Sequence, residues 1–214
     1  MVRRQRIFRV YFVEEKKLKT TIFNTPILSS LLRLVSNSIM RLTGWQVDGT
    51  LPDLPKYVIV GAPHTSNWDF VLFLGIIFRL KINVNYLGKS QLFRNPLGWF
   101  FYYCGGIPVD RSKPTGLVEQ TVEACEKAEH FILVIAPEGT RHGVKEWKRG
   151  FYHIAKSAGI PIVLAKVDGK QKIVHVGEIF HPSENIEADM KAIQGAFKGM
   201  MGLRPNRKYI PLEK

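Results

Sequence analysis

Cysteine is scarce in this sequence, and the two cysteines present lie far apart. Cys104 and Cys125 are the only two in 214 residues, and they form neither a CxxC motif nor a metal-ligand spacing. We therefore expect no disulfide framework, and the sequence favours a reducing environment such as one facing the cytosol. The histidines that follow residue 100 show no ligand spacing either, so we expect no metal site.

Long apolar runs are also missing. The longest uncharged stretches, residues 20–32 and 95–109, are shorter than the ~20 apolar residues that a membrane-spanning helix needs. Arg9 and the charged cluster at residues 14–17 interrupt any apolar core of a secretory signal near the start. The sequence predicts no transmembrane helix, so a chain of this kind that meets a bilayer would lie on its surface.

Acidic residues are too few to balance the basic ones, and the formal net charge is +13. Residues 1–20 hold seven Lys or Arg against two Glu, and residues 198–214 hold five against one. Basic ends of this kind suit a nucleic acid, an anionic lipid surface or an acidic carrier protein. A nucleic-acid partner is disfavoured, because no zinc finger, RNP strand or KH loop is present and the charge is not interleaved with aromatic residues.

The order of apolar segments predicts one α/β domain, a largely parallel or mixed sheet flanked by helices, over residues 45–214. Apolar residues make up 45% of the chain and charged residues 23%, an ordinary globular composition. Alternating strands and helices are typical of such a sheet. The expected strands are residues 57–62, 84–87, 131–136, 160–167 and 172–179, and the expected helices are residues 68–80, 116–130 and 150–157.

Residues 1–44 are expected to form a basic segment followed by an amphipathic helix at residues 26–42. Thr25 is a candidate cap, Pro26 suits the first turn, and Gly44 suits the end. Three- and four-residue steps place these apolar residues in one stripe: Leu28, Leu31, Leu32, Val35, Ile39 and Leu42. The stripe either packs on the domain core or lies at a membrane surface, and the cationic stretch before it favours the membrane.

The strongest chemical signal is GAPHTSNWDF at residues 61–70, between an expected strand and an expected helix. Five steps along an ideal helix would put His64 and Asp69 on different faces, so they meet only if His64 lies in the preceding turn. Asp69 could then orient the imidazole, whose other nitrogen could take a proton from a hydroxyl. Alternatively, Ser66 and Asp69 form a capping box with a purely structural role.

Two further clusters follow apolar runs. Residues 137–141 read Pro-Glu-Gly-Thr-Arg, and residues 105–111 read Gly-Gly-Ile-Pro-Val-Asp-Arg. A glycine lets the backbone approach a ligand closely, and a threonine or arginine offers donors to a phosphate. Either cluster alone could equally be a surface turn.

Taken in order, these clusters resemble the glycerolipid acyltransferase family, typified by 1-acylglycerol-3-phosphate acyltransferases. His64 and Asp69 match its His-x4-Asp motif, residues 106–111 its second block, and residues 137–141 its Pro-Glu-Gly-Thr-Arg block. Lys148, Gly150 and residues 160–163 match the region that closes the pattern, although Leu164 stands where proline is frequent. The resemblance covers roughly residues 45–180. It implies catalysis by His64 and Asp69, and substrate binding by a set of six residues: Lys89, Arg111, Glu138, Gly139, Thr140 and Arg141.

The resemblance also implies the reaction. A thioester, from acyl-CoA or acyl carrier protein, would donate a fatty acyl group to a lysophospholipid hydroxyl, most simply that of 1-acylglycerol-3-phosphate. No cofactor is implied, and the absence of a GxSxG elbow fits a reaction without a serine nucleophile. The enzyme would be peripheral or monotopic on the cytoplasmic face of an anionic membrane. The alternatives are another lipid acceptor, such as a lyso-aminolipid, and a non-catalytic lipid-binding protein of the same fold.

Overall fold

The computed structural model describes residues 20–66, 68–109, 114–139, 144 and 146–203 of the chain. In this part, seven strands form one sheet in the order β1-β7-β6-β2-β5-β3-β4. All neighbouring strands run parallel except β6 and β7, which are antiparallel, so the predicted mixed sheet is confirmed. The strands are β1 (Gln46–Asp48), β2 (Lys56–Ala62), β3 (Asn85–Lys89), β4 (Gly106–Val109), β5 (Phe131–Ile135), β6 (Ile162–Asp168) and β7 (Ile173–Phe180).

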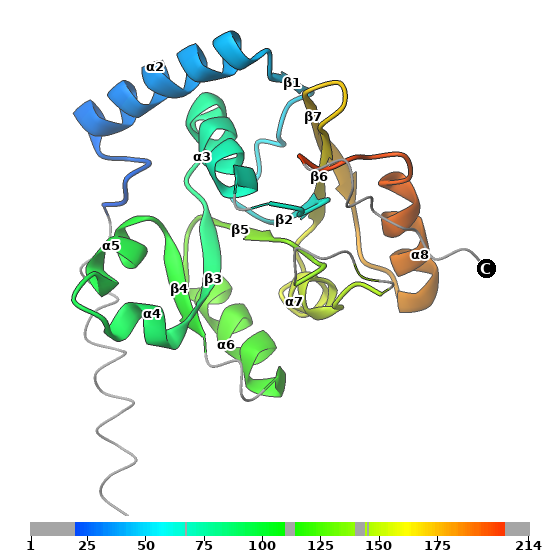
Figure 1. Ribbon diagram of the computed structural model, residues 1–214. Helices are drawn as coiled ribbons and strands as arrows, with labels where there is room; N and C mark the ends of the chain where they lie inside the picture. Colours follow the sequence, from blue (N-terminus) through cyan, green and yellow to red (C-terminus); the bar gives the residue numbers. More distant parts are fainter. Residues whose placement is uncertain (1–19, 67, 110–113, 140–143, 145, 204–214) are drawn as a thin grey trace, which may run out of the picture.

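Helices cover both faces of the sheet. Figure 1 shows α2 and α3 on one side, with α6 and α7 on the other. The helices are α2 (Pro26–Thr43), α3 (Trp68–Leu80), α4 (Ser90–Arg94), α5 (Gly98–Tyr103), α6 (Pro114–Lys127), α7 (Gly150–Ser157) and α8 (Ile186–Ala196). The expected helices at residues 68–80 and 150–157 are therefore correct to the residue.

The core lies on both sides of the central strand β2. Val58 and Val60 are fully buried and point into a large cluster shared with α6, α7 and α8. Tyr57 and Ile59 point the other way, into a smaller cluster beneath α3. Successive strand side chains alternate between faces, and covering both faces requires the continuous apolar run seen in this strand.

The helix α2 begins at the predicted residue and ends one residue later than predicted, but its cap is different. Pro26 occupies its first turn, and Gly44 ends it with a φ of 78°. Thr25 makes no side-chain cap, so that part of the prediction is wrong. Its hydroxyl lies 2.8 Å from the Thr21 carbonyl and 2.7 Å from the Tyr103 hydroxyl, which ties the start of α2 to the end of α5.

The face of α2 that packs against α3 is mainly the polar one. Ser29 and Met40 are buried there, and Asn37 accepts a 3.4 Å hydrogen bond from Arg79 of α3. Four residues of the apolar stripe are exposed on the opposite face, Leu31, Val35, Ile39 and Leu42, and the exposed Ile27 and Leu34 widen the stripe there. Packing of the stripe on the core is therefore contradicted for most of its length; only Leu28 and Leu32 are half-buried.

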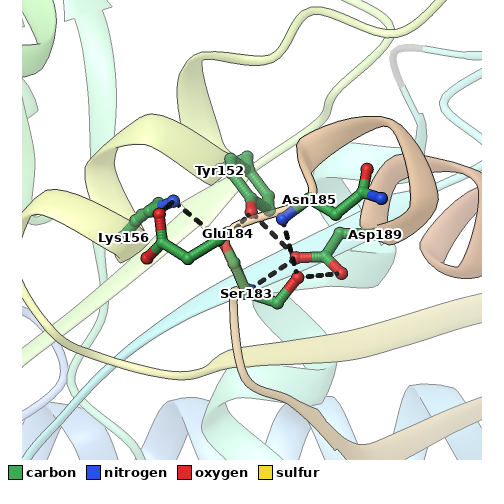
Figure 2. Close-up of polar contacts among 6 residues, drawn as sticks. All are labelled: Tyr152, Lys156, Ser183, Glu184, Asn185 and Asp189. Carbon is green, nitrogen blue, oxygen red and sulfur yellow. Dashed lines mark hydrogen bonds and ion pairs between the residues drawn. The ribbon is translucent and has the colours of Figure 1, made fainter.

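A buried polar network joins α7 to α8. Figure 2 shows the Asp189 carboxylate of α8 between Tyr152 of α7 and Ser183. The Tyr152 hydroxyl lies 2.8 Å from Asp189 Oδ2, and the backbone N–H of Ser183 donates to the same oxygen at 2.6 Å. Lys156 reaches the Glu184 carboxylate at 2.9 Å. These bonds hold α8 against the domain.

The edge strand β1 pairs with a strand that follows it at a great distance in the sequence. Gln46 lies in parallel register with Ile173 of β7. Asp48 and His175 add a side-chain contact of 2.8 Å, which joins residues 127 positions apart. This edge of the sheet therefore closes only when both ends of the domain come together.

Candidate functional site

The site is built where the chain leaves two neighbouring parallel strands in opposite directions. β2 and β5 are adjacent, with Val60 in register with Ile135. The segment after β2 leads to α3 on one side of the sheet, while the segment after β5 leads to α7 on the other (Figure 1). A crevice opens at the carboxyl ends of strands where connections diverge in this way. His64 and Glu138 lie in these two diverging segments.

His64 and Asp69 meet in the geometry that their spacing requires. His64 lies in the turn before α3, and Asp69 lies in the first turn of that helix. The imidazole Nδ1 is 3.0 Å from Asp69 Oδ2. A neutral imidazole with its proton on Nδ1 donates to this carboxylate, which leaves Nε2 as a proton acceptor. The pair is therefore arranged as an oriented general base.

The same carboxylate oxygen also fixes the backbone of the turn. Asp69 Oδ2 accepts hydrogen bonds from the backbone N–H groups of Thr65 at 2.6 Å and Ser66 at 2.7 Å. The Ser66 hydroxyl in turn accepts from the Trp68 N–H at 3.2 Å. The capping-box alternative is thus partly correct, because Asp69 serves the helix terminus and the His64 ring together.

Glu138 approaches His64 from the neighbouring strand. Only 4% of this residue is exposed, and its Oε2 accepts a 2.7 Å hydrogen bond from the His64 backbone N–H. The pKa of the Glu138 carboxyl is raised to about 7, chiefly by burial and to a lesser extent by nearby Asp69, while His64 acts in the opposite direction. The site therefore holds two carboxyl groups in different environments. Asp69 contacts the His64 ring, and Glu138 accepts a hydrogen bond from the His64 backbone.

Gly139 allows a lysine side chain to lie across the turn that follows β5. Its φ of 63° is one that side-chain-bearing residues rarely adopt. A Cβ atom there would lie 2.8 Å from Lys148 Cε and 3.0 Å from Lys148 Nζ. Any larger residue would displace this exposed lysine from its place against Gly139.

An apolar cavity of about 220 Å³ opens beside the His64–Asp69 pair, between α3 and the sheet. Apart from this pair and the Tyr86 ring, its lining side chains carry no polar group. Ile59 of β2 lies on its sheet side, and Phe73 of α3 lies on its helix side. Such a cavity suits a hydrocarbon chain whose reactive end lies at the histidine.

Only one of the other four predicted binding residues lies in the described part of the chain. Lys89 is exposed at the carboxyl end of β3, on the far side of β5 from β2. Arg111, Thr140 and Arg141 lie outside the described residues. The sequence pattern does not predict the placement of Lys148 against Gly139 or the burial of the Glu138 side chain. The apolar character of residues 68–80 on all sides was the one signal for the cavity that α3 covers.

Comparisons with known proteins agree with this arrangement. The family model described as Acyltransferase matches residues 46–165. A 1-acyl-sn-glycerol-3-phosphate acyltransferase of Streptococcus pneumoniae is 28% identical over 56% of this chain and 47% of its own length. The enzyme of the same name from Escherichia coli is 31% identical over 48% of this chain and 43% of its own length. The chain thus spans less than half of these relatives.

A solved structure supports the fold. The crystal structure of the 1-acyl-sn-glycerophosphate acyltransferase from Thermotoga maritima superposes with a TM-score of 0.58 at 18% identity. The match covers 80% of this chain and 77% of that one. At this level of identity the similarity concerns the arrangement of helices and strands.

Proposed function

Because this chain belongs to the Acyltransferase family, we propose that it transfers a fatty acyl group from a thioester to the free hydroxyl of a lysophospholipid. The acceptor that fits best is 1-acylglycerol-3-phosphate, with phosphatidic acid as the product. One observation carries the proposal: the oriented His64–Asp69 pair lies at the wall of an apolar cavity. A base and a hydrocarbon site are the two parts that this reaction requires side by side.

The chemistry needs little beyond these parts. His64 Nε2 takes the proton of the acceptor hydroxyl as its oxygen attacks the thioester carbonyl carbon. The carbon–sulfur bond then breaks, and the imidazolium returns the proton to the departing thiolate. Asp69 stabilises the imidazolium between these steps. No metal or cofactor is needed, since the thioester is already activated.

The substrate groups have separate candidate sites. The apolar cavity would hold an acyl chain, while Lys89, Arg111 and Arg141 would bind the anionic head group, as the sequence motifs imply. The resemblance implies that Glu138 and Gly139 shape the glycerol site, while Thr140 offers a donor to the phosphate. Acyl-CoA and acyl carrier protein both present the required thioester, so either can serve as the donor.

We further propose that residues 1–44 hold the protein on the cytoplasmic face of an anionic membrane. The outward apolar stripe of α2 supports this, since exposed contiguous apolar surface marks an interaction site. Leu97, Trp99 and Phe100, in and beside α5, are also exposed, and the start of α2 is hydrogen-bonded to the end of this helix. Among the described residues, none of the helices is both long enough and apolar enough to span a bilayer.

The test is a product assay with a catalytic control. Purified protein is incubated with a panel of lysophospholipids and with acyl-CoA or acyl carrier protein, and the products are identified by mass spectrometry. We expect acyl transfer, and we expect His64→Ala to abolish it while leaving the melting temperature near that of the wild type. A well-folded His64→Ala variant with wild-type turnover would refute the mechanism. Lipid binding without transfer would instead favour a non-catalytic lipid-binding protein.

A further inference from the structure

The side chain of Glu138 is buried inside the protein. This residue is 4% exposed. Its carboxylate accepts a 2.7 Å hydrogen bond from the backbone N–H of His64. A buried carboxyl is costly, and packing alone would be served by an apolar side chain of similar size. Its position therefore calls for a role that depends on an acceptor oxygen at this point.

The catalytic turn has three successive backbone N–H groups, and two carboxyl groups accept all of them. Glu138 accepts from His64, while Asp69 accepts from Thr65 and Ser66. Asp69 belongs to α3, and Glu138 belongs to the segment after β5, so the turn is held from two separate parts of the fold. The backbone position of His64 in turn sets where its imidazole lies.

We propose that Glu138 is a positioning residue for the proposed acyl transfer. Its carboxyl oxygen fixes the backbone of His64, and so keeps the imidazole within reach of both Asp69 and the acceptor hydroxyl. This role differs from contact with the acceptor's glycerol, which the sequence motif implies. The titratable groups that act on Glu138 are His64 and Asp69.

A matched pair of variants separates the hydrogen bond from the volume. Glu138→Gln keeps an acceptor oxygen at the same reach, whereas Glu138→Met keeps the length and removes the acceptor. Misplacing a catalytic group by about 1 Å can cost about 100-fold in rate, so we expect the Met variant to lose roughly 10- to 100-fold in kcat. The KM for the acceptor should stay unchanged, and the Gln variant should retain most of the wild-type kcat.

Other kinetic outcomes would overturn the proposal. A raised acceptor KM with unchanged kcat in both variants would make Glu138 a substrate ligand. A Met variant with wild-type kcat would show that the reaction does not require the hydrogen bond from His64 to Glu138. Asp189→Asn is the control, because it also alters a buried carboxylate that accepts from a backbone N–H, far from the reaction. It should leave kcat unchanged.

Amide hydrogen exchange tests the same role without any turnover. The His64 N–H should exchange faster in the Met variant than in the Gln variant or the wild type, since it has lost its acceptor. Equal exchange in all three proteins would overturn the inference whatever the activity. If the wild type transfers no acyl group but the exchange difference is present, the proposed function fails and the turn-holding contact stands.

Discussion

At the scale of single residues, one oxygen of Asp69 carries several contacts. Oδ2 accepts from the His64 ring at 3.0 Å and from two backbone N–H groups at 2.6 and 2.7 Å. An ionised carboxylate shares its negative charge between two oxygens, and the hydrogen bonds it accepts are stronger than those to a neutral oxygen. The orientation of the base and the shape of the turn therefore depend on one charged group.

Asp69→Asn should separate the orientation of the His64 ring from the shape of the turn. The amide oxygen can serve the backbone donors of Thr65 and Ser66, but it holds the imidazole only weakly. We expect kcat to fall by roughly 10²- to 10⁴-fold, the usual range of an acid–base contribution, with a small change in melting temperature. Asp69→Ala should lower both. Wild-type turnover in the Asn variant would show that the carboxylate does not orient the ring.

Glu138 should make stability depend on pH in a predictable direction. Its pKa in the folded protein is raised from 4.5 to about 7, chiefly by burial, so the folded state binds more protons than the unfolded state between these values. The stability that this group contributes is present below pH 4.5 and is lost as the pH rises through about 7. Glu138→Gln, which stays neutral, should therefore gain melting temperature relative to the wild type between pH 5 and pH 8.

The matched control for this effect is Glu129→Gln, which removes an exposed carboxylate. Its melting temperature should follow that of the wild type at both pH values. If Glu138→Gln shows no relative gain at pH 8, the carboxyl is solvated more fully than its burial indicates.

At the scale of elements, α2 is a helix that turns its polar side toward the protein. The buried Ser29 and the hydrogen bond between Asn37 and Arg79 hold it to α3. Leu31 is 55% exposed and Leu34 is 65% exposed on the opposite side. Their substitution therefore tests membrane contact without disturbing the core.

Leu31→Glu with Leu34→Glu should remove the part of liposome binding that persists at high salt. Basic side chains near an anionic surface contribute about 1 kcal/mol each, but salt screens that attraction, whereas apolar burial is not screened. Sedimentation with anionic liposomes, at low and high salt, measures both parts. The control is Gln120→Glu with Ser157→Glu, which adds the same charge on exposed positions of α6 and α7. Equal binding by the two double variants would refute the role of the stripe.

The network between α7 and α8 should contribute to stability alone. Burial by itself would raise the pKa of Asp189, but the hydrogen bonds from Ser183 and Tyr152 and the nearby Lys156 together lower it. Asp189→Asn replaces an acceptor oxygen by a donor, and we expect a loss of about 2 kcal/mol. That loss corresponds to a fall of roughly 4–8 °C in melting temperature. The difference should shrink in acid, as the wild-type carboxylate becomes protonated.

At the scale of the whole molecule, the sequence predicts the long elements well and the short ones poorly. The helix at residues 68–80 is strongly apolar and is predicted to the residue. The three-residue strand β1 was not predicted, because its conformation comes from pairing with β7 rather than from its own pattern. The short helices α4 and α5 were also missed, and so was α8, which at 11 residues is an exception to this trend.

In the candidate site, the sequence likewise predicts one contact and misses another. The contact between His64 and Asp69 follows from five residues of local spacing, so the sequence could predict it. The contact between Glu138 and His64 depends on β5 lying beside β2, and strand order cannot be read from a single sequence. The local contact between His64 and Asp69 was therefore predictable, while the contact of Glu138 with the His64 backbone was not.

The pairing of β1 with β7 has a consequence for synthesis on the ribosome. Asp48 is made 127 residues before the His175 that it contacts, and translation proceeds at about 5–20 residues per second. The edge of the sheet thus cannot close until roughly 6–25 s after α2 has been made. During that interval the apolar stripe of α2 is present while the β1 edge of the sheet is still unpaired. A nascent chain can therefore present this stripe to its surroundings before the β1 edge of the sheet closes.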